Sequence, residues 1–472
     1  MNISFHGADQ GVTGSCHLLE CAGKRILIDC GMYQGGHELA EENAEPFGFK
    51  PETIDYLLLT HAHLDHCGRI PLLVKRGFKG EIITTSASTE LARLVMLDSA
   101  GLQEEEARYQ QRKAQRHAGK QRTNIEPLYT TLDALNSLDC FGRHAVYNQP
   151  IDIAPGIRAT FIDAGHILGS ACIYLELQEE GHRHTVLFSG DLGNSNRAIL
   201  RNPTTPPKAD TVIMETTYGD RLHKQLQPSI EELYDAVNTT IGRGGNVIIP
   251  TFALERAQEI LYYLREGTAN GQIKHYINVF LDSPMAISAT EIFRRHPECY
   301  DTETLKISQD GSDPFDLPGL HFTRQTAESI AINQIDSGAI IMAGSGMCTG
   351  GRVRHHLKHN LWDKRCSIVF VGYAARGTLA RRIIDGADRV RIFGEEFSVN
   401  AEIFTIGGFS AHADQAELLA WQQKTGNPGT TYLVHGEEKS MQTFSKLLNN
   451  TKVVMPKLGA TYPLQSAHPS SA

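Results

Sequence analysis

The chain has 472 residues, more than one ordinary domain usually holds, so at least two domains are expected. Hydrophobic residues make up 41% and charged residues 21% of the composition, which is typical of globular proteins and excludes a mostly disordered chain. The formal net charge of -9 argues against a protein that coats nucleic acid nonspecifically, although it leaves a local basic groove open.

Two features of the sequence bear on its compartment. Nowhere do eighteen apolar residues run together, and the start MNISFHGADQGVTGS lacks a basic stretch followed by an apolar run, so neither a membrane span nor a secretion signal is predicted. The nine cysteines are scattered without a CxxC pair, which favours a reducing environment. A cytoplasmic location is therefore expected.

The first part of the chain alternates apolar, β-branched runs with Gly and Asp turns. Strands are predicted at residues 24–30, 54–60, 158–162 and 185–189. Each run ends at a polar residue, which indicates strands that deliver side chains to one edge of a sheet, where ligand sites of α/β proteins lie. The charged segment 101–122, with Glu104 and Arg108 four residues apart, is predicted to be a solvated helix.

From about residue 210 the pattern changes to a strand, a Gly/Pro/Ser turn and a helix, repeated four times. The repeats are NVIIP with FALERAQEILYYL, INVFLDSP with MAISATEIFRRH, AIIMAGSG with GRVRHHLKH, and CSIVFVGYAARGTLARRII. They predict a second domain with a parallel sheet and crossover helices. After about residue 395 the style of the first part returns, so the second domain is predicted to be inserted, and the tail QSAHPSSA to be disordered.

The motif HAHLDH follows the apolar run DYLLL and places four possible metal ligands, His61, His63, Asp65 and His66, within six residues. Alternation puts His61 and His63 on one side, while Asp65 and His66 open the next turn, so one loop can reach two different metals.

One loop cannot fill two zinc sites, and three further candidates stand at predicted strand ends. They are His166 in DAGHILGSA, Asp191 in FSGDLG and His435 in LVHGE. The glycines beside them let the backbone crowd close to a site.

These motifs, together with LIDCG, resemble the metal motifs of the metallo-β-lactamase superfamily. METTYGD around Glu215, FSAHAD around His412 and LVHGE around His435 are similar to the three extra motifs of the β-CASP subgroup, which processes nucleic acids. Segments such as GSGMCTGGRVRHHL also resemble the bacterial and archaeal relatives of the endonuclease subunit of the cleavage and polyadenylation machinery. The resemblance implies an αββα metallo-β-lactamase sandwich, residues 1–209 and 396–472, with an inserted β-CASP α/β domain, residues 210–395.

The resemblance also implies roles for individual residues. One zinc would be held by His61, His63 and His166, the other by Asp65, His66 and His435, with Asp191 between them. Asp29 would organise the metal loop rather than bind a metal directly. Glu215 would orient His412, which would protonate the leaving oxygen, and Asp65 is counted with the catalytic residues.

The implied activity is phosphodiester hydrolysis with two Zn²⁺, in which the metals activate water and His412 supplies the proton. The histidine at position 435 points to RNA rather than DNA, by analogy with the RNA-processing branch. Candidate substrate-binding residues are Ser345, Arg352 and Arg376, in glycine-rich segments that could meet phosphates. The expected partners are an RNA substrate and no membrane, with a homodimer as a further expectation.

Three alternatives stay open at this point. Endonuclease and 5′-exonuclease action would use the same active site. A small-molecule metallohydrolase would share HAHLDH but would not need Glu215, His412 or the insertion. A noncatalytic scaffold subunit would have lost the ligand set, which is complete here.

Overall fold

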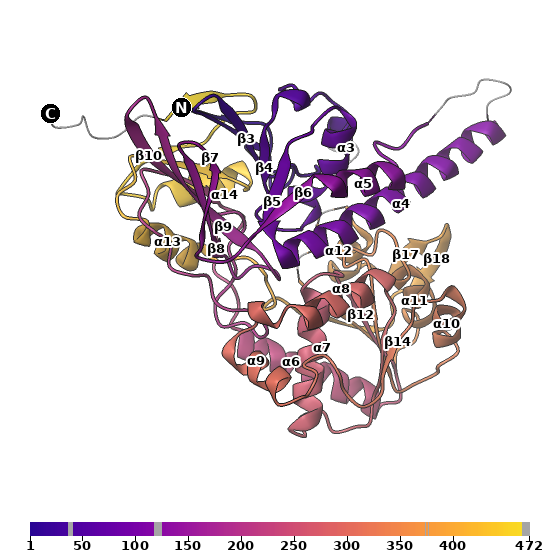
Figure 1. Ribbon diagram of the computed structural model, residues 1–472. Helices are drawn as coiled ribbons and strands as arrows, with labels where there is room; N and C mark the ends of the chain where they lie inside the picture. Colours follow the sequence, from indigo (N-terminus) through magenta and orange to yellow (C-terminus); the bar gives the residue numbers. More distant parts are fainter. Residues whose placement is uncertain (36–40, 118–124, 373, 376, 465–472) are drawn as a thin grey trace. The chain divides into compact units, whose positions relative to one another are not determined.

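The computed structural model describes residues 1–35, 41–117, 125–372, 374–375 and 377–464, without the side chains of residues 115–117 (Figure 1). Two compact units are formed. The first unit comprises Met1–Ser195, Asn202–Leu222 and His412–Ala472, and the second comprises Asn196–Arg201 and His223–Ala411. The tail predicted to be disordered and Arg376 lie outside the described residues.

These bounds differ from the expected ones at 209/210 and 395/396. The strand β11 (Thr211–Glu215) pairs in parallel with β10 (His182–Phe188) on one side and with β20 (Thr430–Val434) on the other. Both partners belong to the first unit, so β11 belongs there too and the chain passes to the second unit only after it.

The first unit contains two seven-stranded sheets. The first has the order β22-β1-β2-β3-β4-β5-β6, with β22 (Thr461–Pro463), β1 (Asn2–Phe5), β2 (His17–Cys21), β3 (Lys24–Ile28), β4 (Tyr56–Leu58), β5 (Glu81–Thr85) and β6 (Phe141–Ala145). The second has the order β21-β20-β11-β10-β9-β8-β7, with β21 (Lys452–Val454), β9 (Ala171–Glu179), β8 (Ile157–Asp163) and β7 (Pro150–Ala154) as its further members. The pairs from β3 to β6 and from β10 to β21 are parallel, and the remaining pairs are antiparallel.

A layer of apolar side chains from both sheets fills the space between them. Phe5 and Ile28 of the first sheet share this core with Phe161, Phe188 and Ile213 of the second. The alternate residues of β11 point the other way: Val212 and Met214 pack with a cluster that includes residues of two C-terminal helices. These helices are α13 (Gln415–Lys424) and α14 (Glu438–Ser445). Because successive side chains of a strand point to opposite faces of the sheet, β11 contributes to both cores.

The other helices of this unit are α2 (Leu64–Cys67), α3 (Ile70–Lys75), α4 (Ser86–His117) and α5 (Thr131–Ser137), with short 3₁₀ turns at Pro51–Thr53 and Leu138–Cys140. The long helix α4 contacts α5 (Figure 1). It begins at Ser86, fifteen positions before the predicted start at residue 101. Buried Ala87, Leu91 and Val95 recur every fourth residue and extend the helical pattern backwards.

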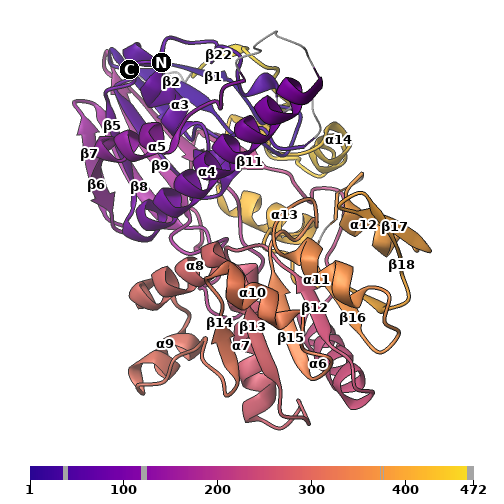
Figure 2. The same ribbon diagram turned by 90° about the vertical axis from the view of Figure 1, so that its right-hand side faces the viewer.

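The second unit is built on a six-stranded parallel sheet with the order β14-β13-β15-β12-β16-β19, which Figure 2 shows from β14 to β16. Its strands are β12 (Val247–Pro250), β13 (Asn278–Leu281), β14 (Leu320–Phe322), β15 (Ala339–Ala343), β16 (Ser367–Val371) and β19 (Glu402–Ile406). A hairpin of β17 (Arg389–Ile392) and β18 (Glu395–Ser398) stands apart from it.

The helices of the second unit are α6 (Leu226–Gly242), α7 (Arg256–Ala269), α8 (Pro284–Arg295), α9 (Thr302–Gln309), α10 (Thr326–Ile332), α11 (Val353–Asn360) and α12 (Leu379–Ile384), with a 3₁₀ turn at Pro297–Cys299. The four predicted repeats of strand, turn and helix correspond to β12 with α7, β13 with α8, β15 with α11, and β16 with α12. The α/β fold with an inserted parallel-sheet domain is therefore confirmed. Among the described residues, we find no helix long and apolar enough to cross a bilayer.

Candidate metal centre

The polar side chains of the first unit that matter here follow the carboxyl ends of strands. Asp29 follows β3, His61 follows β4, Asp191 follows β10, Glu215 ends β11 and His435 follows β20. Because β3 and β4 are parallel, as are β10, β11 and β20, the ends of each set lie at the same edge of their sheet. His166 comes from the loop between β8 and β9. The sequence thus delivers these side chains to one place.

Four side chains form the first candidate ligand group: His61, His63, His166 and Asp191 offer one atom each, and these atoms lie within 4.8 Å of one another. Nδ1 of His63 lies 3.2 Å from Nε2 of His61 and 3.1 Å from Nε2 of His166. Asp191 Oδ2 is 3.5 Å from Nε2 of His61. Nitrogens that converge at such distances are suited to share a cation.

The second candidate group consists of Asp65, His66 and His435, again with atoms within 4.8 Å. The Nε2 atoms of His66 and His435 are 3.3 Å apart, and Nε2 of His435 is 3.4 Å from Asp65 Oδ2. Asp191 faces this group as well, because its Oδ2 lies 3.4 Å from Nε2 of His66 and its Oδ1 lies 3.5 Å from Nδ1 of His435. One carboxylate therefore stands between the two groups.

Asp29 lies behind the second group and fixes its orientation. Its carboxylate is 2.7 Å from Nδ1 of His66 and accepts hydrogen bonds from the backbone N–H and the hydroxyl of Thr60, both 2.8 Å long. A hydrogen bond at Nδ1 leaves Nε2 of His66 as the atom directed at the candidate site. Asp29 thus contacts the second group through the far side of the His66 ring, and its role in supporting a metal ligand stays a prediction.

Burial and charge set the protonation of these groups. Burial lowers the pKa of His61 well below its usual value and that of His63 to about 4, which keeps both imidazoles in the neutral form that binds metals. Burial also acts to lower the pKa of His66, but the carboxylates of Asp191 and Asp29 raise it well above the usual value. The pKa of Asp191 is well below its usual value: burial opposes this, and the charges of His435 and His66 outweigh burial.

His412 and Glu215 form a pair beside these groups. Nδ1 of His412 lies 3.2 Å from Oε1 of Glu215, which is fully buried and also accepts a 2.7 Å hydrogen bond from the Leu192 N–H. The backbone of His412 bridges to Gly193, two residues after Asp191. Burial lowers the pKa of His412, but the charge and hydrogen bond of Glu215 outweigh it and raise the pKa to about 9. His412 is thus a partly exposed imidazole held in its charged form.

Several backbone positions at the site are tight. Asp29 and His435 adopt the left-handed conformation, with φ of 59° and 49°, which non-glycine residues seldom do outside functional sites. A Cβ at Gly31 would lie 1.5 Å from the Asp65 carbonyl oxygen, and one at Gly193 would lie 1.9 Å from that of Gly165. Glycine at both positions is required for the metal loops to pack.

Comparison with known proteins agrees with this architecture. The family model described as the metallo-beta-lactamase superfamily matches residues 10–250, that of the Beta-Casp domain matches 257–383, and that of the Zn-dependent metallo-hydrolase RNA specificity domain matches 396–456. The chain belongs to the β-CASP group of the metallo-β-lactamase superfamily. Membership implies divalent metal ions, in agreement with the candidate ligand groups.

Three relatives illustrate the match. The chain is 38% identical to "Ribonuclease TTHA0252" of Thermus thermophilus over 466 residues, which cover 98% of this chain and 100% of the relative. It is 31% and 34% identical to "Transcription termination factor FttA" of Methanocaldococcus jannaschii and Methanosarcina mazei, with 94% and 93% of this chain and 68% and 67% of those proteins covered.

A crystal structure of a protein of unknown function from Enterococcus faecalis shares the fold. Its TM-score is 0.53 at 11% identity, and the match covers 98% of this chain and 99% of that one. At this identity the likeness concerns the fold alone.

Two of the predicted substrate-binding residues, Ser345 and Arg352, lie in the described part of the second unit. Ser345 follows β15, and no described residue is recorded as a hydrogen-bond partner of its buried Oγ. Arg352, at the start of α11, donates from Nη1 to Asp282 Oδ1 at 2.7 Å and from Nη2 to the Arg324 carbonyl oxygen at 2.7 Å. The Arg352 guanidinium is therefore engaged within its own unit.

Two further residues at the β-CASP metal centre were not expected from the sequence. Thr60 bonds Asp29 and lies 3.0 Å from Nδ1 of His61 through its hydroxyl, while the hydroxyl of Thr217 lies 3.2 Å from Nδ1 of His435. The sequence could have suggested both threonines, because Thr60 adjoins the motif residue His61 and Thr217 lies two residues after the motif residue Glu215.

Proposed function

We propose that the chain is a metal-dependent ribonuclease that hydrolyses RNA phosphodiester bonds with two zinc ions. The observation that carries the proposal is the pair of converging ligand groups that share Asp191. The RNA specificity domain match and the full-length similarity to a protein named ribonuclease support RNA as the substrate.

We assign His61, His63 and His166 to one zinc, Asp65, His66 and His435 to the other, and Asp191 to both. The donor set fits zinc, which prefers imidazole and carboxylate ligands. Asp191 Oδ1 is buried without a hydrogen-bond partner in the described part of the chain, and a bound cation would satisfy such an oxygen. Bound ions would supply Lewis-acid polarisation of the phosphate and activate the attacking water.

The proton for the leaving ribose oxygen is assigned to His412, with Glu215 as the positioning residue. The imidazole is charged through its carboxylate partner and, with a side chain 21% exposed, has access to solvent and substrate. Asp65 stays assigned to metal binding and catalysis, and Asp29 to the support of His66.

Four further assignments rest on sequence patterns rather than on contacts. Ser345, Arg352 and Arg376 are proposed to bind RNA. Cleavage is proposed to be endonucleolytic. A homodimer and a cytoplasmic location complete the proposal.

The test uses internally labelled linear and circular RNA of the same sequence. Zinc-loaded protein should cut both, because only an endonuclease opens a circle, and chelator-treated protein should cut neither. His166→Ala should be inactive, while His321→Ala, a matched change at an exposed histidine of the second unit, should behave as the unaltered chain. Cleavage of the linear RNA alone would establish exonuclease action, and no cleavage of either would reject the ribonuclease assignment.

A further inference from the structure

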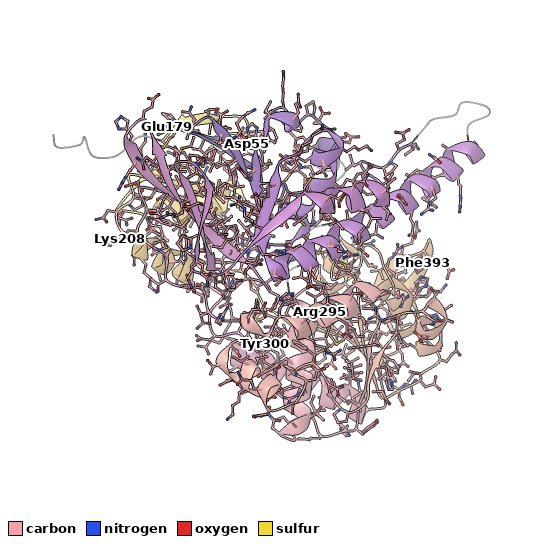
Figure 3. All side chains as sticks on the ribbon, viewed as in Figure 1. Asp55, Glu179, Lys208, Arg295, Tyr300 and Phe393 are labelled. Atoms are coloured by element: carbon pink, nitrogen blue, oxygen red, sulfur yellow. The ribbon has the colours of Figure 1, made fainter. Side chains whose placement is uncertain are left out.

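A short excursion of the chain, Asn196–Arg201, belongs to the second unit, although the residues on both sides of it belong to the first. Within the second unit the backbone of Leu200 pairs with that of Tyr300, which is labelled in Figure 3. Ile199 has a φ of 78°, a conformation that is rare for a β-branched residue and costs free energy. A strained excursion of this kind calls for a reason, and the side chain of Arg197 supplies one.

Arg197 joins two parts of the second unit. Its side chain is only 7% exposed, and its Nε donates to Oε1 of Glu259 at 2.9 Å. Its Nη1 donates to the carbonyl oxygen of Ser410 at 2.6 Å. Ser410 belongs to residues 407–411, hereafter the return segment, which follows β19 and ends where the first unit resumes. One guanidinium thus ties a carboxylate of α7 to the backbone of the return segment.

Glu259 is fully buried and binds a second arginine. Its other carboxylate oxygen, Oε2, pairs with Nη1 of Arg256. The guanidinium of Arg256 lies 5.7 Å from the ring centre of Phe409, which is also fully buried. The three charged side chains, hereafter the arginine triad, therefore contact the return segment at two consecutive residues, Phe409 and Ser410.

A buried triad of two arginines and one glutamate is weak evidence for stability. Charged groups lose their hydration on burial, and replacement of such a triad by apolar side chains is often neutral or stabilising. Its geometry is specific, however, because the planar guanidinium of Arg197 binds a carboxylate and a carbonyl oxygen in a fixed orientation. The arginine triad is therefore suited to place the return segment.

The return segment leads directly to His412. Consecutive Cα atoms are 3.8 Å apart, so the Cα atoms of Ser410 and His412 are at most about 7.6 Å apart. In the first unit the backbone of His412 bridges to Gly193. Ala411 is thus the single residue between the carbonyl group that Arg197 binds and the residue that carries the imidazole. A displacement of about 1 Å at a catalytic group can slow a reaction 100-fold, so this attachment matters for chemistry.

We propose that Arg197, oriented by Glu259, is a positioning residue for the proposed general acid. It fixes the carbonyl group of Ser410 and, through the backbone, the direction in which His412 presents its imidazole to the leaving oxygen. This inference rests on the proposed ribonuclease function, and it gives the second unit a part in proton transfer.

The test measures two reactions of the zinc-loaded full chain, cleavage of RNA and hydrolysis of bis(p-nitrophenyl) phosphate, whose leaving group needs little protonation. Arg197→Met removes both hydrogen bonds, whereas Arg197→Lys keeps the charge but not the planar fork. Both variants should retain zinc and slow RNA cleavage, Arg197→Met by roughly 10- to 100-fold, with little change for the nitrophenyl ester. The matched control is Arg294→Met, which removes an arginine paired with Glu291 and Asp313 in the same unit and should preserve both rates.

A double substitution separates positioning from a purely structural role. In the His412→Ala background, Arg197→Met should not slow RNA cleavage further, because the group that it positions is gone. Hydrogen exchange of the return segment should become faster in Arg197→Met. Additive losses, equal losses on both substrates or unchanged exchange would overturn the proposal.

Circular dichroism shows whether the variants fold. If Arg197→Met does not, Arg197→Lys decides the outcome by the same criteria. A failure of the unaltered chain to cleave RNA would reject the proposed function itself, and the positioning role with it, whereas RNA cleavage that is unaffected by either change at Arg197 would reject the positioning role alone.

Discussion

Two buried aspartates, one in each unit, lie beside histidines but differ in how many hydrogen bonds their carboxylates accept. Asp282, after β13, accepts hydrogen bonds from Ser329, Thr323 and Arg352 and lies 2.7 Å from Nε2 of His356. Asp191 has one oxygen without a hydrogen-bond partner in the described residues and faces histidine nitrogens that also face one another. A carboxylate whose oxygens all accept hydrogen bonds, such as that of Asp282, has a structural role. A carboxylate with a free oxygen that faces imidazole nitrogens, such as that of Asp191, is suited to bind a cation.

The strongest test of this contrast removes metal ligands. His61→Ala or His63→Ala should lower the bound zinc and reduce RNA hydrolysis to background, because each change removes a side chain that is proposed to bind zinc directly. Elemental analysis and an RNA cleavage assay would measure the two effects. His356→Ala, beside Asp282, should retain the zinc of the unaltered chain. Zinc content that stays constant in both His61 and His63 variants would remove the basis of the ligand assignment.

The next largest effect on activity is expected for His412, which lies beside the two candidate ligand groups. His412→Ala should retain zinc but slow RNA cleavage by roughly 10²–10⁴-fold, the usual contribution of acid–base catalysis. A nitrophenyl phosphodiester, whose leaving group needs little protonation, should be affected far less. Glu215→Gln should give a milder loss, because an amide can position the imidazole but does not favour its charged form.

A loss of zinc in His412→Ala would identify His412 as a ligand instead. Asp191, Glu215 and His412 also form a group whose ligand atoms lie within 4.8 Å, so the zinc count is needed to separate the two roles.

Asp282→Asn probes the structural aspartate. It should lower the free energy of unfolding by about 3 kcal/mol, because it leaves the buried His356 and the half-buried Arg352 without their carboxylate partner. Denaturant unfolding followed by circular dichroism would measure the change, and zinc bound to the first unit should be unaffected. A loss of zinc equal to that of His61→Ala would contradict the separation of the two aspartates.

The same aspartate predicts a pH dependence. Burial would raise the pKa of Asp282, but the hydrogen bonds of His356, Ser329 and Arg352 outweigh it and lower the pKa to about 2. The stabilisation is therefore present above the unfolded pKa, near 4, and is lost as the pH falls through about 2. The difference in stability between the unaltered chain and Asp282→Asn should narrow over this window, as acid titration of unfolding would show.

The smallest effect is expected for substrate contacts. Arg376→Ala should weaken RNA binding a few-fold and reduce the slope of log Kd against log salt by about one, the change expected for one lost phosphate contact. Lys274→Ala, a change at an exposed lysine before β13, serves as the control for loss of one charge. Equal changes in Kd and in its salt dependence for both variants would mean that Arg376 acts only through the net charge of the protein.

The sequence was informative where the chemistry is local. The HAHLDH motif and the glycine-flanked His166, Asp191 and His435 could be located because strand ends and metal ligands leave short, specific patterns. The ion pair of Arg352 with Asp282 could not, since it joins residues 70 positions apart through a fold with no local signature. The glycine-rich, basic segment predicted substrate binding by Arg352, which stays a prediction, and gave no sign of this internal contact.

The unit boundary illustrates the same limit. The strand β11 has a sequence that fits either unit, and its pairing with β10 and with β20, the latter more than two hundred residues later, assigns it to the first. The start of α4 was also predicted too late. The first half of this helix is apolar and buried, and in the sequence such a segment cannot be told from a buried strand by its composition.

The position of β20 has a consequence for biosynthesis. The strands that carry Asp29, His61 and Asp191 leave the ribosome early, but β20, with His435 after it, is translated only once the whole second unit has been made. A nascent or truncated chain without residue 435 has an incomplete second candidate ligand group, and one without residue 412 also lacks the proposed general acid. If these residues have the proposed roles, a chain becomes an active nuclease only after translation of the last part of the first unit, so we expect an unfinished chain to be inactive toward the messenger RNA that encodes it.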